Sequence, residues 1–209
     1  MRTVFFKRFP MLAGAALIGL ASTAHANLLA NPSFELPVLS GGDVPGAVGW
    51  TAFNAVFTIR VAPQDGDQAL KMFGTPSGVF QDFPTLPGQE WIGSVYGLNF
   101  SGDPLSGAQI GAANIEWRDS GGNLISFETS QIVNSSTPQG SLPGDYVFGT
   151  VSGVAPAGAV TARFVLITGA FAGPGGGAVW FDNASFSLVP EPAMLSVVIP
   201  AAMSLRRRR

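Results

Sequence analysis

The 209-residue chain has no cysteine and a single histidine, His25. The absence of cysteine excludes disulfide bonds and thiol chemistry. Because His25 lies in the leader segment described next, the remaining chain has no Ser-His-Asp or Cys-His nucleophile and no histidine-bound zinc. Hydrolysis of glycosides by two carboxylates is the one hydrolytic class that these absences allow, but the sequence marks out no pair of acids. We therefore predict that the protein is not an enzyme.

The N-terminal segment has the three parts of a secretory signal peptide. They are the basic residues Arg2, Lys7 and Arg8, the apolar residues 11–20, and an A-x-A site at residues 24–26. We predict a signal peptide over residues 1–26. Its removal by signal peptidase would leave Asn27 as the first residue of an exported protein.

The C-terminal segment combines a proline-rich motif, a short apolar run and a cluster of arginines. These parts are Pro190, Glu191 and Pro192, then residues 193–205, then Arg206, Arg207, Arg208 and Arg209. As a helix the apolar run would span about 20 Å, less than the hydrocarbon core of about 30 Å. Terminal cations keep such a segment's end on the cytoplasmic side. The tail therefore predicts a transient association with the inner membrane, not a permanent anchor.

This order of motif, apolar run and arginine cluster resembles the PEP-CTERM sorting signal of bacterial exosortase substrates. The resemblance implies recognition by an exosortase, cleavage at or near the motif, and delivery of the remainder to the outer surface or the extracellular matrix. An ordinary C-terminal membrane tail is the alternative. We assign residues 189–209 to the sorting signal and residues 27–188 to one folded domain.

Positive charge is scarce once the two ends are set aside. Residues 27–188 contain twelve acidic and four basic residues, a net charge of −8. Such a surface repels phosphate backbones, so we predict no binding to nucleic acid. It suits cations or neutral ligands instead.

Between the two ends, short apolar runs alternate with turns rich in glycine, proline, asparagine and aspartate, a pattern typical of strands. We predict strands at residues 28–35, 56–61, 69–73, 78–83, 90–100, 108–118, 124–131, 146–154, 160–168 and 179–188. Residues 119–123 predict a hairpin turn, and the glycine-rich residues 40–49 and 169–177 predict loops. The sequence therefore predicts an all-β fold, a two-sheet antiparallel β-sandwich or jelly roll.

Several short motifs follow one another along this domain. They are residues 27–35 (NLLANPSFE), Gly49-Trp50, residues 66–70 (GDQAL), residues 78–81 (GVFQ), Pro87-Gly88 with Trp91 and Ser94, and residues 179–183 (VWFDN). Together they resemble the galactose-binding-like jelly rolls of carbohydrate-binding modules, especially those of families 4, 9 and 22. The resemblance implies a β-sandwich, often a structural calcium ion, and sometimes a sugar-binding face.

Two acidic residues from opposite ends of the domain are candidate calcium ligands. Glu35 follows the first predicted strand and Asp182 lies near the start of the last, and in this type of jelly roll the two segments lie side by side. Calcium binds about six to eight oxygen atoms, carboxylates included. We predict that Glu35 and Asp182, with Asp67 as a further ligand, hold one structural calcium ion. Solvated or capping carboxylates are the alternative.

Sugar binding would need exposed aromatic rings, because a ring offers apolar area to the C–H face of a pyranose. The four tryptophans fit core positions: Trp50, Trp91 and Trp180 by the resemblance, and Trp117 because it shares a strand face with Ile115. Trp91 and Tyr96 point to opposite faces of one strand. The sequence leaves as sugar-binding candidates the residues Tyr96, Tyr146 and Arg163. Arg118 and Glu116 could also hydrogen-bond sugar hydroxyls, although exposed charges on a solvated face explain them equally well.

Two functions remain open on this sequence. The first is a non-catalytic exported protein of the cell surface or extracellular matrix whose jelly roll binds polysaccharide. The second is a structural or adhesive envelope component without a sugar ligand. Exposed aromatic rings beside polar side chains on one sheet face would favour the first, and a face filled by apolar side chains would favour the second.

Overall fold

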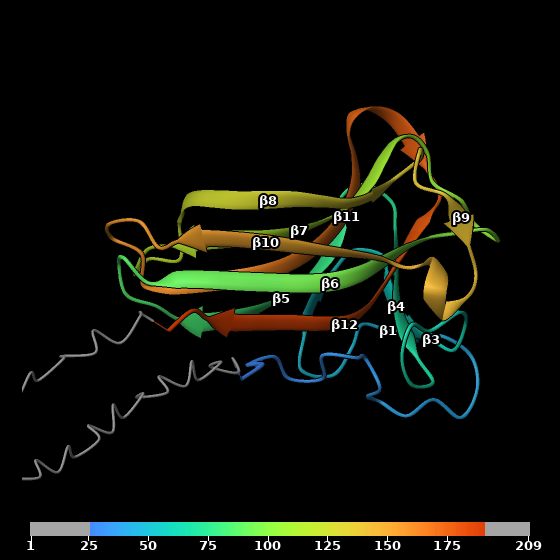
Figure 1. Cartoon of the computed structure of the whole chain (residues 1–209), viewed down its shortest axis with the longest axis horizontal. Helices are drawn as coiled ribbons and strands as arrows, with labels where there is room; N and C mark the ends of the chain where they lie inside the picture. The colour runs from blue at the N-terminus through green and yellow to red at the C-terminus, as the bar shows by residue number, and fades with distance from the viewer. Residues whose placement is uncertain (1–25, 191–209) are drawn as a thin grey trace, which may run out of the picture.

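The structure, a computed structural model, describes residues 26–190, which form two β-sheets packed face to face (Figure 1). The predicted two-sheet antiparallel β-sandwich is confirmed. The predicted signal peptide, residues 1–26, and sorting signal, residues 189–209, lie outside the described residues except for Ala26, Val189 and Pro190. No helix within residues 26–190 is long and apolar enough to cross a membrane.

The first sheet has seven strands in the order β1-β3-β4-β12-β6-β10, with β9 paired beside β6. Their bounds are Val44–Pro45 (β1), Val56–Ile59 (β3), Ala69–Phe73 (β4), Ala178–Leu188 (β12), Glu90–Phe100 (β6), Val147–Val154 (β10) and Gln139–Gly140 (β9). The pairs are antiparallel except for that of β6 with β9, which is parallel.

The second sheet has five antiparallel strands in the order β2-β5-β11-β7-β8. Their bounds are Thr51–Phe53 (β2), Ser77–Pro84 (β5), Thr161–Gly176 (β11), Ser106–Arg118 (β7) and Leu124–Asn134 (β8). A short 3-10 helix, Pro143–Asp145 (η1), precedes β10. The predicted strands at residues 69–73 and 90–100 coincide with β4 and β6.

The main core lies between the two sheets and follows from the alternation of side chains along each strand. On β11, Phe164 is buried with its neighbours two residues away, whereas Arg163 points to the outer face. The Phe164 ring stacks on Phe186 of β12, with ring centroids 4.9 Å apart, and Phe186 stacks in turn on Trp91 of β6. Both sheets and this core lie within residues 27–188, the segment to which the sequence assigns the folded domain.

The four tryptophans are buried, as the sequence predicted. The indole of Trp91 donates to Thr85 Oγ1 at 2.9 Å, and that of Trp180 donates to Val61 O at 3.1 Å. Trp117 Nε1 has no hydrogen-bond partner in the described part of the chain. These rings stabilise the sandwich and are not available to a ligand.

The prediction of a strand at residues 28–35 is wrong. Asn31 and Phe34 have φ angles of 49° and 55°, a left-handed conformation that does not occur in a regular strand. The Asn31 side chain holds the resulting turn: its amide donates to Leu36 O and Val48 O, and its oxygen accepts from Leu36 N. An apolar pattern cannot reveal such a turn, because the turn depends on backbone dihedral angles.

The glycine-rich residues 169–177, predicted as a loop, belong largely to β11, which continues to Gly176. Pairing with β7 is interrupted between Ala170 and Gly175 and then resumes. Backbone pairing needs no side chains, so glycine did not prevent it. Residues 40–49 contain the short strand β1, and the predicted hairpin turn at residues 119–123 is confirmed, with Asp119 N donating to Asn123 O at 3.0 Å.

Candidate functional site

The outer face of the five-stranded sheet carries the best-formed candidate site of the described domain. Because alternate residues of a strand point to opposite faces, burial of Phe164 and Leu166 in the core directs Arg163, Val165 and Ile167 outward. The neighbouring strands β5, β7 and β8 present their own outward residues beside these three.

Four charged side chains cross this face in a row that we call the charged row, namely Asp82 (β5), Arg163 (β11), Glu116 and Arg118 (β7). Arg163 donates to both carboxylate oxygens of Asp82, from Nε at 2.6 Å and from Nη2 at 2.8 Å. Arg118 donates to Glu116 Oε2 from Nη2 at 2.5 Å and from Nε at 3.2 Å. The hydrogen bond to Asp82 raises the pKa of Arg163 further above its ordinary value.

Next to the charged row lies a shallow depression of about 310 Å³, which we call the apolar hollow. It is lined by Ile110, Ala112, Asn114, Phe127, Thr129, Ile167 and Phe171. Phe127 of β8 and Phe171 of β11 are 53% and 58% exposed, and both border the hollow. Thr129 Oγ1 donates to Asn114 Oδ1 at 2.7 Å. The hollow thus combines two exposed aromatic rings with a pair of polar side chains.

A second depression, of about 230 Å³, is lined by Arg163, Glu116 and Arg118 of the charged row, and it shares Ile167 with the apolar hollow. The guanidinium of Arg163 lies 3.6 Å from the centroid of the Phe80 ring, so this cation covers one face of the ring. Ile167 lines both depressions, and we call these two neighbouring depressions together the sheet groove. Exposed aromatic surface lies at one end of it and paired charges at the other.

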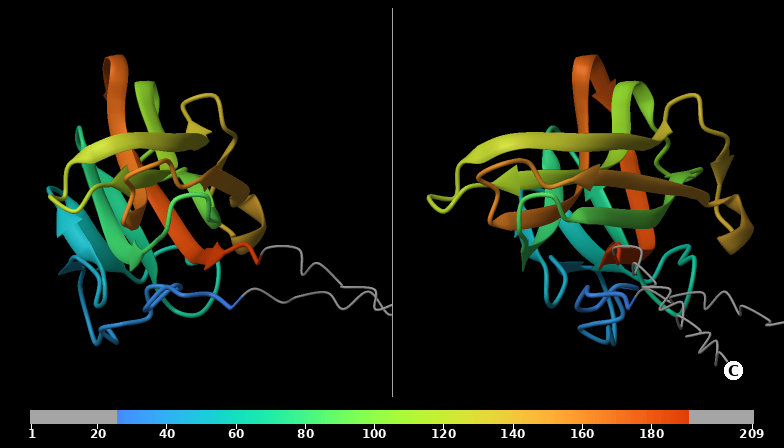
Figure 2. Two further views of the ribbon diagram at one scale, coloured as in Figure 1. Left: turned by 90° about the vertical axis from the view of Figure 1, so that its left-hand side faces the viewer. Right: turned by 60° about the vertical axis from the view of Figure 1, so that its left-hand side comes forward.

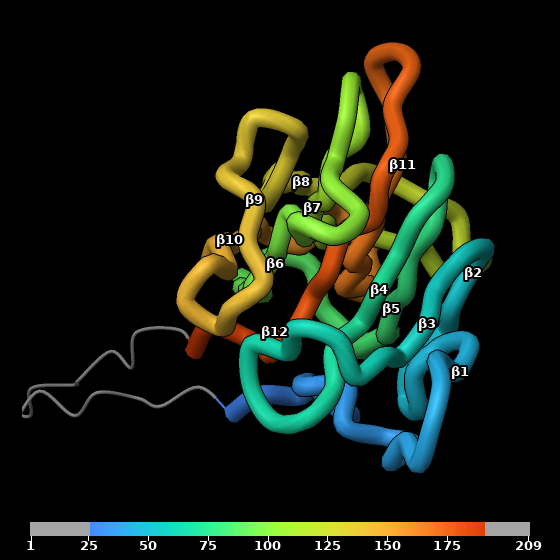
Figure 3. Tube along the Cα trace, turned by 90° about the vertical axis from the view of Figure 1, so that its right-hand side faces the viewer, coloured from blue at the N-terminus to red at the C-terminus, as the bar shows by residue number. Residues whose placement is uncertain are grey.

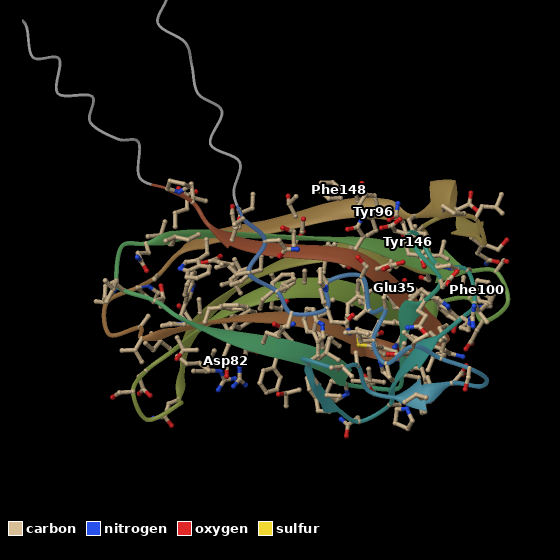
Figure 4. All side chains as sticks on the ribbon, turned by 90° about the horizontal axis from the view of Figure 1, so that it is seen from below. Glu35, Asp82, Tyr96, Phe100, Tyr146 and Phe148 are labelled. Atoms are coloured by element: carbon tan, nitrogen blue, oxygen red, sulfur yellow. The ribbon has the colours of Figure 1, made fainter. Side chains whose placement is uncertain are left out.

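The candidate sugar residue Tyr96 lies elsewhere, on the outer face of the seven-stranded sheet. Its ring packs against Phe148 of β10, with centroids 5.0 Å apart. Figure 4 shows Tyr96 and Phe148 on one side of the sandwich and Asp82, the partner of Arg163, on the opposite side. The structure therefore does not bring Tyr96 and Arg163 together in one site.

Tyr146, the third sugar candidate, is buried with only 8% of its surface exposed. It belongs to a second apolar cluster, on the outer face of the seven-stranded sheet, which also contains Trp180 and Leu98. Its hydroxyl donates to Ala62 O at 2.7 Å. Burial raises the pKa of Tyr146 well above its usual range, and the charge of Asp182 acts in the same direction. Tyr146 thus fastens the segment that follows β3 onto the sheet and offers no surface to a sugar.

The candidate calcium ligands Glu35 and Asp182 meet at one loop, residues 64–68, which lies beside β12 (Figure 3). Asp182 Oδ2 accepts from the backbone N–H groups of Gln64 (2.8 Å) and Asp65 (3.1 Å). Glu35 Oε1 accepts from Asp67 N and Gln68 N, both at 3.0 Å. Burial raises the pKa of Asp182 to about 7, although the N–H donors oppose this shift.

Asp67 turns away from this pair, and its carboxylate lies 3.9 Å from Arg60. Residues 26–190 contain no group of three or more acidic, histidine or cysteine side chains placed to share an ion. The oxygen chemistry of Glu35 and Asp182 suits calcium, but their backbone N–H partners already satisfy the same oxygens. The calcium ion stays a prediction.

Sequence reasoning missed Phe127, Phe171, Asn114 and Thr129. It considered tryptophan and tyrosine as stacking rings and left phenylalanine out. The alternation around Phe127 places it on the same face as Thr129, and this signal could have marked both residues. Phe171 lies in the glycine-rich stretch predicted as a loop, where no alternation assigns a residue to a sheet face.

No family model matches this sequence, and no curated protein matches it either. Solved structures do match. The CBM22-1 xylan-binding domain of Xyn10C from Paenibacillus barcinonensis is 19% identical with a TM-score of 0.50, and the match covers 82% of this chain and 99% of that domain.

Two larger proteins match over a part of their length. The enzymatically active domain of tailspike protein 4 from bacteriophage CBA120 is 17% identical (TM-score 0.52), with 78% of this chain and 21% of that chain covered. The arabinose-bound α-L-arabinofuranosidase MgGH51 is 15% identical (TM-score 0.52), with 78% and 26% covered. This chain therefore spans about a fifth and a quarter of those two proteins. At these identities the likeness shows the fold alone: the domain is a jelly-roll β-sandwich of the kind found in carbohydrate-binding modules.

Proposed function

We propose that the domain binds polysaccharide, without catalysis, in the sheet groove on the outer face of the five-stranded sheet. One observation carries this proposal: two exposed phenylalanines, Phe127 and Phe171, border a hollow whose lining includes the polar pair Asn114 and Thr129. Exposed aromatic rings beside polar side chains are the arrangement that distinguishes a sugar-binding face from a purely structural one.

The rings, the polar pair and the isoleucines of the apolar hollow would each contact a bound sugar in a different way. A phenyl ring offers a flat apolar surface to the C–H groups of a sugar ring. Asn114 Oδ1 already accepts a hydrogen bond from Thr129, and the Asn114 amide nitrogen has no partner within residues 26–190. That nitrogen can donate to a sugar hydroxyl, and the Thr129 oxygen can accept from one. Ile110 and Ile167 exclude water beneath the ligand.

The carboxylates of the groove support a binding role more than a hydrolytic one. Glycoside hydrolysis requires a carboxylic acid that protonates the leaving oxygen and a second carboxylate across the bond. Asp82 and Glu116 are each bonded to an arginine. Neither is therefore free to take the acid role.

We also propose that the protein is exported, processed by signal peptidase and an exosortase, and delivered to the outer surface or extracellular matrix. The support is the order of the segments: the predicted leader ends at residue 26, and the predicted sorting motif starts at Pro190, two residues after the last strand ends at Leu188. Val189 N still donates to Glu90 O, at 2.8 Å. The sorting motif, Pro190, Glu191 and Pro192, thus begins at the edge of the folded domain.

Affinity electrophoresis of residues 27–190 in gels that contain soluble neutral polysaccharides tests the binding proposal. We expect retardation by at least one of arabinoxylan, β-glucan, galactan and galactomannan. Phe127→Ala and Phe171→Ala should each weaken binding about tenfold, the equivalent of about 1.4 kcal/mol for a lost stacking ring. The matched control is Phe148→Ala, which removes a ring that is 54% exposed on the opposite sheet and should leave binding unchanged.

The opposite pattern would contradict the proposal. If Phe148→Ala weakens binding while Phe127→Ala and Phe171→Ala do not, the ligand binds to the seven-stranded sheet. If no polysaccharide retards the protein, the structural or adhesive role becomes the better explanation of the fold.

A further inference from the structure

The sheet groove contains two of the four basic residues of the domain, and both are already neutralised by carboxylates of the same sheet. Arg163 lies directly opposite Asp82 on one neighbouring strand and opposite Glu116 on the other. Arg118 lies on the same face, two residues beyond Glu116, and bonds to it. Charges of opposite sign therefore alternate along the row, and the row as a whole is neutral.

Both ion pairs are fixed in place more firmly than ordinary surface pairs. The Arg163 side chain is 19% exposed, is held by two hydrogen bonds to Asp82, and lies on the Phe80 ring. The side chains of Arg118 and Glu116 are 22% and 20% exposed, and Arg118 also donates to Gly122 O at 2.9 Å. The Asp82 side chain is 44% exposed, so its pair with Arg163 is held in one geometry mainly by the two parallel hydrogen bonds.

The two remaining basic residues of the domain are also paired and do not line the groove. Lys71 lies 3.4 Å from Asp103, and Arg60 lies 3.9 Å from Asp67. An acidic ligand would therefore meet no unpaired cation in the groove, and it would approach a domain whose net charge is −8.

We propose that Asp82 and Glu116 restrict the sheet groove to uncharged polysaccharides by neutralising Arg163 and Arg118. This inference rests on the proposed sugar-binding function of the groove. A uronate or sulfate group could bind an arginine here only by displacing the carboxylate that the arginine already holds. The displaced carboxylate would then lie unpaired on a half-buried sheet face, which is unfavourable. Neutral sugars avoid this conflict, since they bind the fixed charges through their hydroxyl groups.

The proposal predicts how salt and substitution change affinity. Binding of a neutral glycan should hardly change with ionic strength, because no net charge is exchanged. Removal of the two carboxylates should create two free cations and thereby a site for acidic glycans, whose binding would weaken as salt is added.

The test compares neutral polymers with the same polymers after oxidation of their C6 hydroxyls to carboxylates. β-Glucan and galactomannan are the probes, and binding to residues 27–190 is measured by affinity electrophoresis and titration calorimetry at low and high salt. The groove variant is Asp82→Asn with Glu116→Gln. The matched control, Asp43→Asn with Glu90→Gln, removes the same negative charge outside the groove from two carboxylates that pair with none of the four basic residues of the domain.

We expect the unaltered domain to bind the oxidised polymer at least tenfold more weakly than its neutral parent. The groove variant should bind the oxidised polymer at least tenfold more tightly than the unaltered domain does, and added salt should reverse this gain. The control should gain much less. Equal or tighter binding of the oxidised polymer by the unaltered domain would overturn the inference, as would an equal gain in the control.

The outcomes separate the two proposals. If the unaltered domain binds neutral and oxidised polymers alike, the groove remains a sugar site and only the selection against charge is wrong. If it binds neither form, both proposals fail. The comparison of the two polymers on the unaltered domain needs no variant, and single substitutions at Asp82 and at Glu116 replace the double variant if that protein does not fold.

Discussion

Tyr146 has a different role in the structure from the one that the sequence predicted. As an aromatic residue at the start of a predicted strand it was a candidate for stacking on a sugar, yet its ring lies under the segment that follows β3. Its hydroxyl bonds to Ala62 O, which ties that segment to the seven-stranded sheet. The residue therefore contributes to stability and not to binding.

Removal of this one hydroxyl should have a measurable cost. Tyr146→Phe leaves the ring in place and deprives the Ala62 carbonyl of its donor, so we expect a loss of about 1 kcal/mol in the free energy of unfolding. Urea denaturation of residues 27–190 measures it. Tyr96→Phe is the control, because the Tyr96 hydroxyl makes no hydrogen bond to another of the described residues. Equal effects of the two substitutions would show that the hydrogen bond to Ala62 contributes nothing.

Individual site residues could be predicted from the sequence only in part. Arg163 and Glu116 were named as polar groups for sugar hydroxyls, and the structure places both in the sheet groove. Tyr96 lies on the opposite sheet. The difference is physical: alternation along a strand predicts which residues of that strand share a face, but the sheet that the strand joins depends on contacts between distant segments.

At the scale of single strands, β6 shows why close packing needs a small residue at one position. Gly93 lies opposite Phe186 of β12, and a methyl group added at Gly93 would overlap the ring of Phe164 from the other sheet. Phe164 is itself stacked on Phe186. The two sheets can approach each other here only because β6 has no side chain at this point.

Gly93→Ala should therefore strain the core. We expect a loss of about 1–3 kcal/mol in the free energy of unfolding, the usual cost of an overpacked core. The control is Gly41→Ala, because a methyl group at Gly41 meets no atom of the described chain within 4 Å. Urea denaturation of the two variants compares them, and an unchanged midpoint for Gly93→Ala would show that the Phe164 ring can move aside freely.

The strands themselves were largely predictable except for the short strands β1, β2 and β9, which were not predicted, and two of the failures share one cause. Residues 69–73 and 90–100 combine β-branched, aromatic and apolar residues and form β4 and β6 as predicted. Residues 28–35 have a similar composition but are interrupted by the left-handed Asn31 and Phe34. Residues 169–176 are mostly glycine and alanine, with Phe171 as their one aromatic residue, yet both ends of this stretch pair with β7 as part of β11. In both failures the backbone decides the structure, and apolar periodicity does not report on it.

At the scale of the whole molecule, the two ends of the domain lie side by side, because the first described residues bond to β12, the last strand (Figure 2). The Asn27 side chain donates to Ala184 O at 2.9 Å and accepts from Phe186 N at 3.1 Å, while Leu28 N donates to Phe186 O at 2.9 Å. Asn27, which the predicted signal cleavage would leave as the first residue, is thus hydrogen-bonded to the last strand of the sandwich. The predicted leader and sorting signal join the sandwich at neighbouring points, so neither interrupts its core.

The loop at residues 64–68 links two segments that are far apart in the sequence, since Glu35 and Asp182 both accept hydrogen bonds from its backbone. If calcium also binds these carboxylates, it stabilises the folded state by mass action. We then expect the thermal midpoint of residues 27–190 to rise in calcium relative to EDTA, and Asp182→Ala to abolish this rise. The measurement belongs at pH 8, because burial raises the pKa of Asp182 to about 7 and calcium needs the ionised carboxylate.

The control is Asp145→Ala, which removes another carboxylate that accepts two backbone N–H groups, those of Ser141 and Leu142. It should lower the midpoint equally in calcium and in EDTA. Equal midpoints of the unaltered domain in calcium and EDTA would contradict the calcium prediction. In that case the four backbone N–H groups alone fix Glu35 and Asp182 to the loop, and Asp182→Ala should lower the midpoint whether or not calcium is present, because the N–H groups of Gln64 and Asp65 lose their acceptor.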